Sequence, residues 1–296
     1  MSLPAAPPFS DERFVADIRT TAALVEAPFS ERTTRIAVGA YADRFATSTV
    51  LWKTTERPRD GLFYRFYAPF HRDTIGPAQT AGLLRASAAS GKLLRDWSER
   101  AGERAVTHCD FHAWHGLAKT YVFFPSLETG AALASPRVPE AVSRNSAAFR
   151  AAGLPYVFGV AVNHLHDALN VYFHNGGPLT RRQCAGLAAL VGADGTAHPA
   201  GEPDQGPAPA YDACAAATVG LDDGAVHRVA FYTTGLPSCA FPGLPERVAR
   251  LSAHAPSEAA NVTHVLARSL APGGRAHLKV EKSYRGDFAA FIRGLG

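Results

Sequence analysis

Features that mark secreted, disulfide-stabilised or membrane proteins are missing from this sequence. Only four cysteines occur in 296 residues (Cys109, Cys184, Cys214 and Cys239), and none forms a C-x-x-C pair. A chain of this length does not need disulfides for stability, so we expect reduced thiols and a cytoplasmic protein. The N-terminal sequence MSLPAAPPFSDERF has neither the basic nor the apolar region of a signal peptide. No apolar run approaches the roughly 20 residues of a membrane span.

The chain also has little excess charge. It contains 30 basic and 26 acidic residues, a formal net charge of +4, and no basic tail or arm. This balance argues against nucleic acid as the main partner. With 47% hydrophobic and 19% charged residues, the composition is typical of a soluble globular protein with a large core. We expect one domain over residues 1–296, a flexible start at residues 1–9, and a monomer.

Helical and strand-like segments alternate in pairs along the chain. Helical periodicity is found over residues 10–25, 29–46, 77–87, 91–102, 138–153, 179–192, 243–254 and 256–262, and at the C-terminal end. Strand patterns occupy residues 48–55, 61–70, 117–125, 155–163, 168–174, 211–219, 225–234, 262–269 and 276–284. Strands joined by short turns are antiparallel, which excludes the single β–α alternation of Rossmann and TIM folds. About ten such strands can close into a barrel that encloses a ligand cavity, with helices outside.

Basic residues occupy strand segments in which apolar side chains are expected. They are Lys53, Arg65, Lys119, Arg228 and Lys279. A single basic side chain in a strand usually points into water, and the sequence alone does not decide which face lies inside. Burying several like charges together is costly unless an anion completes the set. We interpret these residues as the cationic floor of a strand-built cavity that binds a diphosphate.

Side chains alternate along a strand, so each basic residue shares a face with particular neighbours. These faces group Lys119 with Tyr121 and Phe123, Arg65 with Phe63 and Tyr67, Arg228 with Tyr232, Lys279 with Glu281 and Ser283, and Asn170 with Tyr172 and His174. Cations stabilise a leaving diphosphate. Aromatic rings stabilise a carbocation by about 1–2 kcal/mol each when desolvated. The pairing of both residue types indicates chemistry on an allylic diphosphate.

Six segments resemble the ABBA-type aromatic prenyltransferases. They are FVADIRTTAALVEAP, LWKTTERPRDGLFYRFY, LAKTYVFF, ALNVYFHNGGPL, GAVHRVAFY and HLKVEKSYRGDF. The nearest branch contains the CloQ and NovQ enzymes of bacterial aminocoumarin pathways and their phenazine-prenylating relatives. The resemblance implies an α+β fold, a ten-stranded antiparallel β-barrel surrounded by α-helices with the active site in its lumen. It also implies transfer of a dimethylallyl or geranyl group from its diphosphate to a ring carbon of an aromatic small molecule in bacterial secondary metabolism.

The resemblance assigns roles to individual residues. The diphosphate would be held by Lys53, Arg65, Lys119, Arg228 and Lys279, with help from Asn170. The allyl cation would be walled by Tyr121, Tyr172 and Tyr232, with Cys214 beside the prenyl chain. The acceptor pocket would include Phe158 and Ser283. Glu281 would accept a hydrogen bond from the acceptor's OH or NH group and could take up the proton afterwards.

Two positions depart from the family pattern. Magnesium-dependent members carry an Asp on the strand where this chain has Arg65. A cation there would replace the metal's charge, so we expect that no cofactor is required and that magnesium is dispensable. Phenol-specific members place an Arg opposite the Glu, where this chain has Phe158. An apolar wall favours a flat acceptor such as a phenazine, carbazole, indole or naphthoquinone over an acidic, hydroxyphenylpyruvate-like one.

Two other functions stay open at this point. A non-catalytic barrel that binds an anionic amphiphile would keep the cations without releasing diphosphate. A single-stranded nucleic-acid-binding protein would use basic and aromatic strand faces. The segment HCDFHAWH, residues 108–115, has His108 and His112 at a spacing often used by zinc ligands. No Glu follows the first His, so we expect a partly exposed loop and no metal site.

Overall fold

A closed antiparallel β-barrel forms the centre of the protein. The computed structural model describes residues 8–68, 73–84, 88–102, 105–174, 179–193, 213–237 and 243–293. The strands are β1 (Thr49–Thr55), β2 (Phe63–Tyr67), β3 (Val106–His112), β4 (Gly116–Glu128), β5 (Tyr156–Asn163), β6 (Ala168–His174), β7 (Ala213–Gly220), β8 (Val226–Pro237), β9 (Thr263–Ala271) and β10 (Arg275–Arg285). Each strand pairs with its neighbours in sequence, and the ring closes where β1 meets β10. The expected ten-stranded barrel is confirmed.

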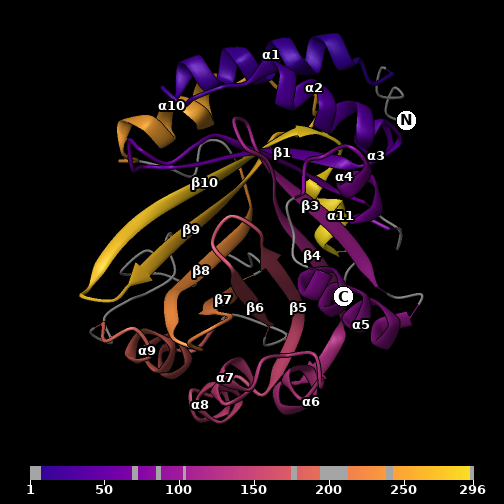
Figure 1. Ribbon diagram of the computed structural model, residues 1–296. Helices are drawn as coiled ribbons and strands as arrows, with labels where there is room; N and C mark the ends of the chain where they lie inside the picture. The colour runs from indigo at the N-terminus through magenta and orange to yellow at the C-terminus, as the bar shows by residue number, and fades with distance from the viewer. Residues whose placement is uncertain are drawn as a thin grey trace.

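Helices cover the outside of this barrel (Figure 1). They are α1 (Asp11–Leu24), α2 (Glu31–Ala40), α3 (Ala42–Thr47), α4 (Gly76–Thr80), α5 (Ala88–Ala101), α6 (Thr129–Leu133), α7 (Glu140–Ser143), α8 (Asn145–Ala151), α9 (Arg181–Ala189), α10 (Glu246–His254) and α11 (Phe288–Arg293). In Figure 1, α1, α2 and α10 lie across one side of the barrel, and α5 to α9 lie around the other. None of the helices in the described ranges is long and apolar enough to cross a membrane.

Several helix boundaries follow directly from capping residues. The Ser10 hydroxyl accepts a hydrogen bond from the Arg13 N–H at 3.3 Å, so α1 begins directly after Ser10. Thr180 and Gln183 form a reciprocal capping box at the start of α9. The single helix expected over residues 29–46 is divided at Tyr41 into α2 and α3.

The hydrophobic core lies between the barrel and its helices. On one side, Phe149 of α8 packs against Phe173 of β6, with ring centroids 4.9 Å apart. On the other, Phe14 of α1 stacks on Trp52 of β1 at 5.3 Å. Outward-facing strand residues are therefore apolar, because helices cover them and exclude water. The inward-facing residues are left to carry polar and charged groups.

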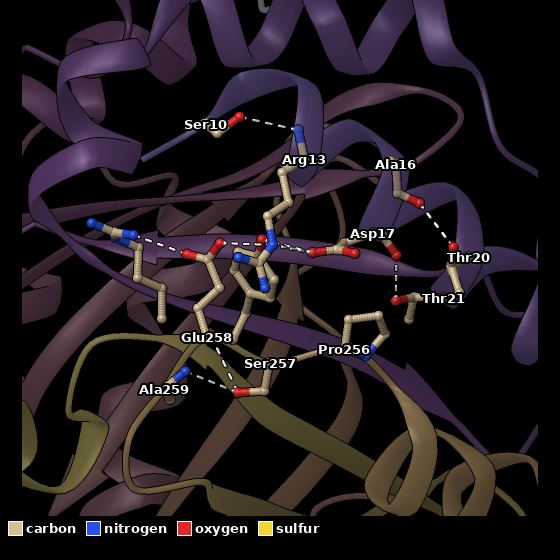
Figure 2. A network of polar contacts seen from close by, with 12 residues as sticks. Ser10, Arg13, Ala16, Asp17, Thr20, Thr21, Pro256, Ser257, Glu258 and Ala259 are labelled. Carbon is tan, nitrogen blue, oxygen red and sulfur yellow. Dashed lines mark hydrogen bonds and ion pairs between the residues drawn. The ribbon is translucent and has the colours of Figure 1, made fainter. Parts of the chain in front are cut away.

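A polar network joins α1 to the segment after α10 (Figure 2), and the same segment bonds to strand β10. Arg13 Nε lies 3.1 Å from Glu258 Oε1, and Arg285 Nη1 donates to Glu258 Oε2 at 2.9 Å. The Ser257 hydroxyl donates to the Ser283 carbonyl at 2.9 Å. The helix expected over residues 256–262 is therefore wrong, because this segment is not helical and bonds to strand β10 of the barrel.

The loop expected at residues 108–115 is also wrong over most of its length. Residues 106–112 form strand β3, and only Trp114 and His115 in the following turn are exposed. Cys109 and Phe111 point into the outer core, so His108 and the remaining alternate residues point inward. Of the expected flexible start, residues 1–7 lie outside the described residues, and Phe9 stacks on the Phe45 ring at 5.9 Å.

Candidate active site

Strand pairing brings the basic residues singled out in the sequence onto the inner face of the barrel, here called the lumen. Directly paired residues on neighbouring strands share a face. Lys53 lies opposite Glu281 where β1 meets β10, and Arg65 lies opposite Asp110 where β2 meets β3. Asp110 in turn lies opposite Lys119 on β4. Charged side chains from five strands therefore meet at one region of the lumen.

Two buried carboxylates lie among these cations. Asp110 is 0% exposed and Glu281 is 1% exposed. Asp110 forms an ion pair with Lys53, and its Oδ2 lies 3.2 Å from Arg65 Nη2. Glu281 Oε1 lies 2.8 Å from Lys279 Nζ, and its Oε2 lies 3.2 Å from Arg65 Nη1. Arg65 thus bridges the two carboxylates, which partly neutralise the cationic floor expected from the sequence.

A second polar set links the other two cations. Lys119 Nζ donates to Asn170 Oδ1 at 3.4 Å, and Asn170 Nδ2 donates to the Thr218 hydroxyl at 2.9 Å. Arg228 Nη2 donates to the same hydroxyl at 3.2 Å. Within the described ranges, neither Lys119 nor Arg228 pairs with a carboxylate. Their positive charge is therefore available to an anion.

Burial makes the lysines easier to deprotonate than lysines in water. It lowers the pKa of Lys53 to about 7, although the Asp110 carboxylate opposes the change. Burial, followed by repulsion from Arg228 and Lys53, holds the pKa of Lys119 well below its ordinary value. Burial raises the pKa of Glu281, but Arg65 and Lys279 outweigh it, so the pKa stays below its ordinary value. An anion entering the lumen would favour the protonated lysines.

Aromatic side chains form a layer beside the charged groups. The layer contains Tyr121, Phe123, Phe158, Tyr172 and Tyr232. The Tyr172 ring lies 5.9 Å from Tyr121, 5.6 Å from Phe123 and 6.2 Å from Tyr232. Gly159 makes room for the Phe123 ring, because a Cβ at Gly159 would lie 2.4 Å from that ring. The lumen therefore has an aromatic wall built from four strands.

The aromatic layer touches the cations directly. Lys279 Nζ lies 4.1 Å from the centroid of the Tyr232 ring. Arg65 Cζ lies 5.3 Å from the centroid of the Tyr121 ring. Cys214 of β7 lies opposite Tyr232 in the strand register. A molecule with an anionic head and an apolar tail would place its two ends against matching surfaces.

The two residues expected in the acceptor pocket lie in different surroundings. Phe158 belongs to the aromatic layer, 5.4 Å from Phe123 between ring centroids. Ser283 is buried on β10, and its hydroxyl accepts the Thr263 N–H at 2.9 Å. The Ser283 side chain is therefore already used to hold β10 against β9.

Three lumen residues were not assigned to the active site from the sequence. Thr218 connects Asn170 with Arg228, and Asp110 pairs with Lys53 and Arg65. His108 lies on the same face of β3 as Asp110. Across the described ranges, no group of three or more His, Cys, Asp and Glu side chains is arranged to hold a metal ion.

Comparison with known proteins gives a consistent result. The model of the aromatic prenyltransferase Orf2 family matches residues 9–296. The chain is 36% identical over 297 residues to 4-hydroxyphenylpyruvate 3-dimethylallyltransferase of Streptomyces niveus, covering 99% of this chain and 90% of that protein. It is 34% identical over 294 residues to an aromatic prenyltransferase of Sclerotinia sclerotiorum, covering 97% and 95%.

A solved structure supports the fold. The crystal structure of NotF in complex with brevianamide F and DMSPP aligns with a TM-score of 0.50 and 10% sequence identity. The alignment covers 97% of this chain and 98% of that one. At this identity, the likeness concerns the barrel architecture alone.

Proposed function

The chain belongs to the aromatic prenyltransferase Orf2 family, and from this membership we propose that it transfers a dimethylallyl group from its diphosphate to a ring carbon of an aromatic acceptor. As a member of this family it is a transferase of prenyl groups. The Streptomyces niveus relative is named for dimethylallyl transfer. For this chain, the observation that carries the proposal is the contact between lumen cations and the aromatic layer, as in Lys279 over Tyr232.

The charge of the site suits a diphosphate. With all lysines protonated, as a bound anion favours, five positive charges come from Lys53, Arg65, Lys119, Arg228 and Lys279, and two negative charges come from Asp110 and Glu281, which leaves three positive charges. A prenyl diphosphate carries close to three negative charges at neutral pH, because the last proton of a terminal phosphate has a pKa of about 6. Binding would therefore neutralise the net charge of these seven side chains.

The proposed reaction begins with ionisation of the allylic diphosphate. The C–O bond breaks, the diphosphate leaves with the electron pair, and the cations stabilise its charge. Tyr121, Tyr172 and Tyr232 shield the allyl cation through their ring faces. The acceptor ring carbon forms the new C–C bond and then loses its proton, which restores the aromatic ring. Geranyl transfer would follow the same steps with a longer tail.

Glu281 is proposed to orient the acceptor. Its carboxylate is ionised, because Arg65 and Lys279 hold its pKa below the ordinary value. An ionised carboxylate accepts a hydrogen bond from an acceptor OH or NH and makes the ring more electron-rich. It can also take up the proton that the ring loses.

Arg65 supports activity without magnesium. Its guanidinium is buried at the centre of the charged groups and remains positive at any ordinary pH. A fixed cation at this point performs the charge neutralisation for which a metal ion would otherwise be needed. We therefore propose that no metal or other cofactor is required.

The acceptor is proposed to be flat and uncharged, like a phenazine, carbazole, indole or naphthoquinone. Phe158 supports this choice, since it adds an aromatic face to the layer around Phe123 and Tyr172. The Streptomyces niveus relative is named for an acidic acceptor, 4-hydroxyphenylpyruvate, so the two enzymes would differ here. We further propose that the protein belongs to the CloQ and NovQ branch and acts in bacterial secondary metabolism. We also propose that it is monomeric and cytoplasmic.

One assay tests the reaction and the metal requirement together. Dimethylallyl diphosphate is incubated with the protein and the four acceptor types, with and without EDTA, and products are identified by mass spectrometry. We expect a prenylated product and released diphosphate in both conditions. Activity lost in EDTA would contradict the argument from Arg65, and no product in either condition would contradict dimethylallyl transfer.

The same assay separates the two other functions considered from the sequence. A binding barrel would retain the diphosphate compound without cleaving it. A nucleic-acid-binding protein would need its cations on the surface, whereas Lys53 and Arg65 are buried inside a closed barrel. Binding of a single-stranded oligonucleotide that weakens steeply with salt would support the nucleic-acid-binding function.

A further inference from the structure

His108 is a buried lumen residue that the proposed chemistry does not use. It lies opposite Tyr67 of β2 and Tyr121 of β4 in the strand register, so all three share the inner face. It is two residues before Asp110 on β3 and is 1% exposed. His108 therefore lies beside both the aromatic layer and the charged groups.

Among the residues that the structure describes, neither nitrogen of the His108 ring has a hydrogen-bond partner. A buried polar group without a partner costs about 1–3 kcal/mol. Native proteins contain few such groups, and each one calls for a reason, such as a functional role or a bound water or ion. His264, another fully buried histidine, differs in that its Nε2 lies 3.0 Å from the hydroxyl of Ser252 on α10.

Aromatic rings surround His108. Its ring centroid lies 4.6 Å from Tyr67, 5.0 Å from Phe123 and 5.5 Å from Phe291. Phe291 belongs to the short helix α11, and it also contacts Tyr67 at 5.0 Å. Because α11 is not a barrel strand, the Phe291 ring can change its rotamer without altering strand pairing.

His108 is neutral in these surroundings. Burial, with a further contribution from the positive charge of Arg65, holds its pKa well below the ordinary value. A neutral imidazole has one N–H donor and one nitrogen acceptor. It can therefore satisfy a hydroxyl, an N–H group or a ring nitrogen on an uncharged molecule.

We propose that His108 is a specificity-determining residue that hydrogen-bonds a polar group on the edge of a flat, uncharged aromatic acceptor. This inference rests on the proposed function, since it concerns the acceptor of that reaction. The rings of Tyr67 and Phe123 contact the face of the acceptor, and the imidazole recognises its edge. An aromatic compound of the same size without a polar group leaves both nitrogens unsatisfied and binds less tightly.

The test compares two probes of similar size, 1-naphthol and 1-methylnaphthalene, by equilibrium dialysis in the presence of the non-ionising analogue dimethylallyl S-thiolodiphosphate. One hydrogen bond in a buried site corresponds to about a tenfold difference in Kd. We expect the wild-type protein to prefer 1-naphthol by about this factor. In His108→Phe the preference falls to less than about twofold, and in His108→Gln part of it returns, because the amide can still donate and accept.

His264→Phe is the matched control, since it removes a buried histidine from the other face of the sheet. Its preference for 1-naphthol should equal that of the wild type. Equal binding of both probes to the wild type, or an unchanged preference in His108→Phe, would overturn the proposal.

A second measurement does not depend on the folding of a variant. In wild-type protein labelled with ¹⁵N-histidine, 1-naphthol should shift the His108 ring nitrogen resonances and 1-methylnaphthalene should not. Unmoved resonances would overturn the proposal. The proposed function fails separately, if the wild type neither binds the thiolodiphosphate nor releases diphosphate with any aromatic compound.

Discussion

Arg65 on β2 and Asp110 on β3 are directly paired across the two strands, and Arg65 Nη2 lies 3.2 Å from Asp110 Oδ2. The same oxygen pairs with Lys53 and accepts a hydrogen bond from the Tyr121 hydroxyl at 3.3 Å. One buried carboxylate oxygen thus positions two cations and one aromatic ring. A displacement of Asp110 would move groups proposed to act on both parts of the prenyl diphosphate.

Replacing Asp110 by Asn should destabilise the empty protein and strengthen its response to ligand. The change leaves Lys53 and Arg65 buried without their shared counter-charge, which costs about 3–5 kcal/mol of unfolding free energy. A diphosphate would then supply the missing negative charge. We expect a lower midpoint of urea unfolding, and a larger stabilisation by dimethylallyl S-thiolodiphosphate than in the wild type.

Asp222→Asn, in the exposed turn after β7, is the control for loss of a carboxylate. It should change stability by no more than about 0.5 kcal/mol. Equal stability of Asp110→Asn and wild type would contradict the role given to Asp110.

Removing Lys119 or Arg228 should weaken prenyl diphosphate binding without unfolding the protein. Within the described ranges, these cations have no carboxylate partner, so their loss does not strand a buried negative charge. Each hydrogen bond to a charged group is worth about 1.5–3 kcal/mol, or roughly 10- to 100-fold in Kd. Calorimetric titration of Lys119→Ala and Arg228→Ala with the thiolodiphosphate measures the loss.

Arg268→Ala removes a basic residue from the outer face of β9, where Arg268 lies opposite Phe231. This variant should bind the diphosphate as tightly as the wild type. If all three variants lose affinity equally, the lumen cations are not the binding groups.

Affinity for the diphosphate should fall as pH rises above 7. Burial lowers the pKa of Lys53 to about 7 and holds that of Lys119 well below its ordinary value, so the empty site loses protons above pH 7. The bound anion favours the protonated lysines, so binding takes up protons. For each proton taken up, Kd increases up to tenfold per pH unit.

Calorimetry at pH 7.0 and 8.5 in two buffers measures both the affinity and the proton uptake. Lys53→Arg should flatten the dependence, because arginine stays protonated throughout this range. A Kd that is constant over this range would contradict the lowered lysine pKa values.

Glu281→Gln should reduce catalysis more than diphosphate binding. The amide keeps the shape of the side chain but loses the negative charge that accepts the acceptor's hydrogen bond, and general-base effects are worth about 10²- to 10⁴-fold in rate. The site also becomes more positive, so Kd for the thiolodiphosphate should not rise. A comparison of kcat with this Kd tests the role, and equal losses in both would indicate that Glu281 is only structural.

The sequence predicts which side chains share a strand face with each basic residue. Strand periodicity is fixed at two residues, so Lys119, Tyr121 and Phe123 had to share a side. The sequence could not identify that side as the interior, because both faces of these strands are buried. The apolar outer face meets helices, and the charged inner face lines the lumen.

Strand β3 was missed because its inner face carries polar side chains. Its His108, Asp110 and His112 looked like loop residues, although they alternate with Thr107, Cys109 and Phe111 as strand residues do. A second signal was the number of strands. Nine strands joined by successive antiparallel turns would bring the first and last together in parallel, so an antiparallel closed ring needs an even number. Assigning this strand would have placed Asp110 and His108 in the lumen.

The segment 256–262 could not be predicted from local sequence. Its bonds run to residues that are distant in the chain, as when Trp52 Nε1 donates to the Pro256 carbonyl at 2.8 Å. Such contacts override helix propensity only after the barrel has formed.

The closing pair of the barrel has a consequence for how activity is acquired. Nine strand pairs join consecutive strands, and five of these (β1–β2, β3–β4, β5–β6, β7–β8 and β9–β10) have no helix between their strands, whereas β1 and β10 come from opposite ends of the chain. Contacts between distant segments form late, because the intervening chain must first be ordered. Lys53 and Glu281 face each other across this last junction. A folding intermediate in which β1 and β10 are not yet paired would thus contain most of the strands but lack the assembled site. The onset of turnover during refolding would therefore report when β1 and β10 pair.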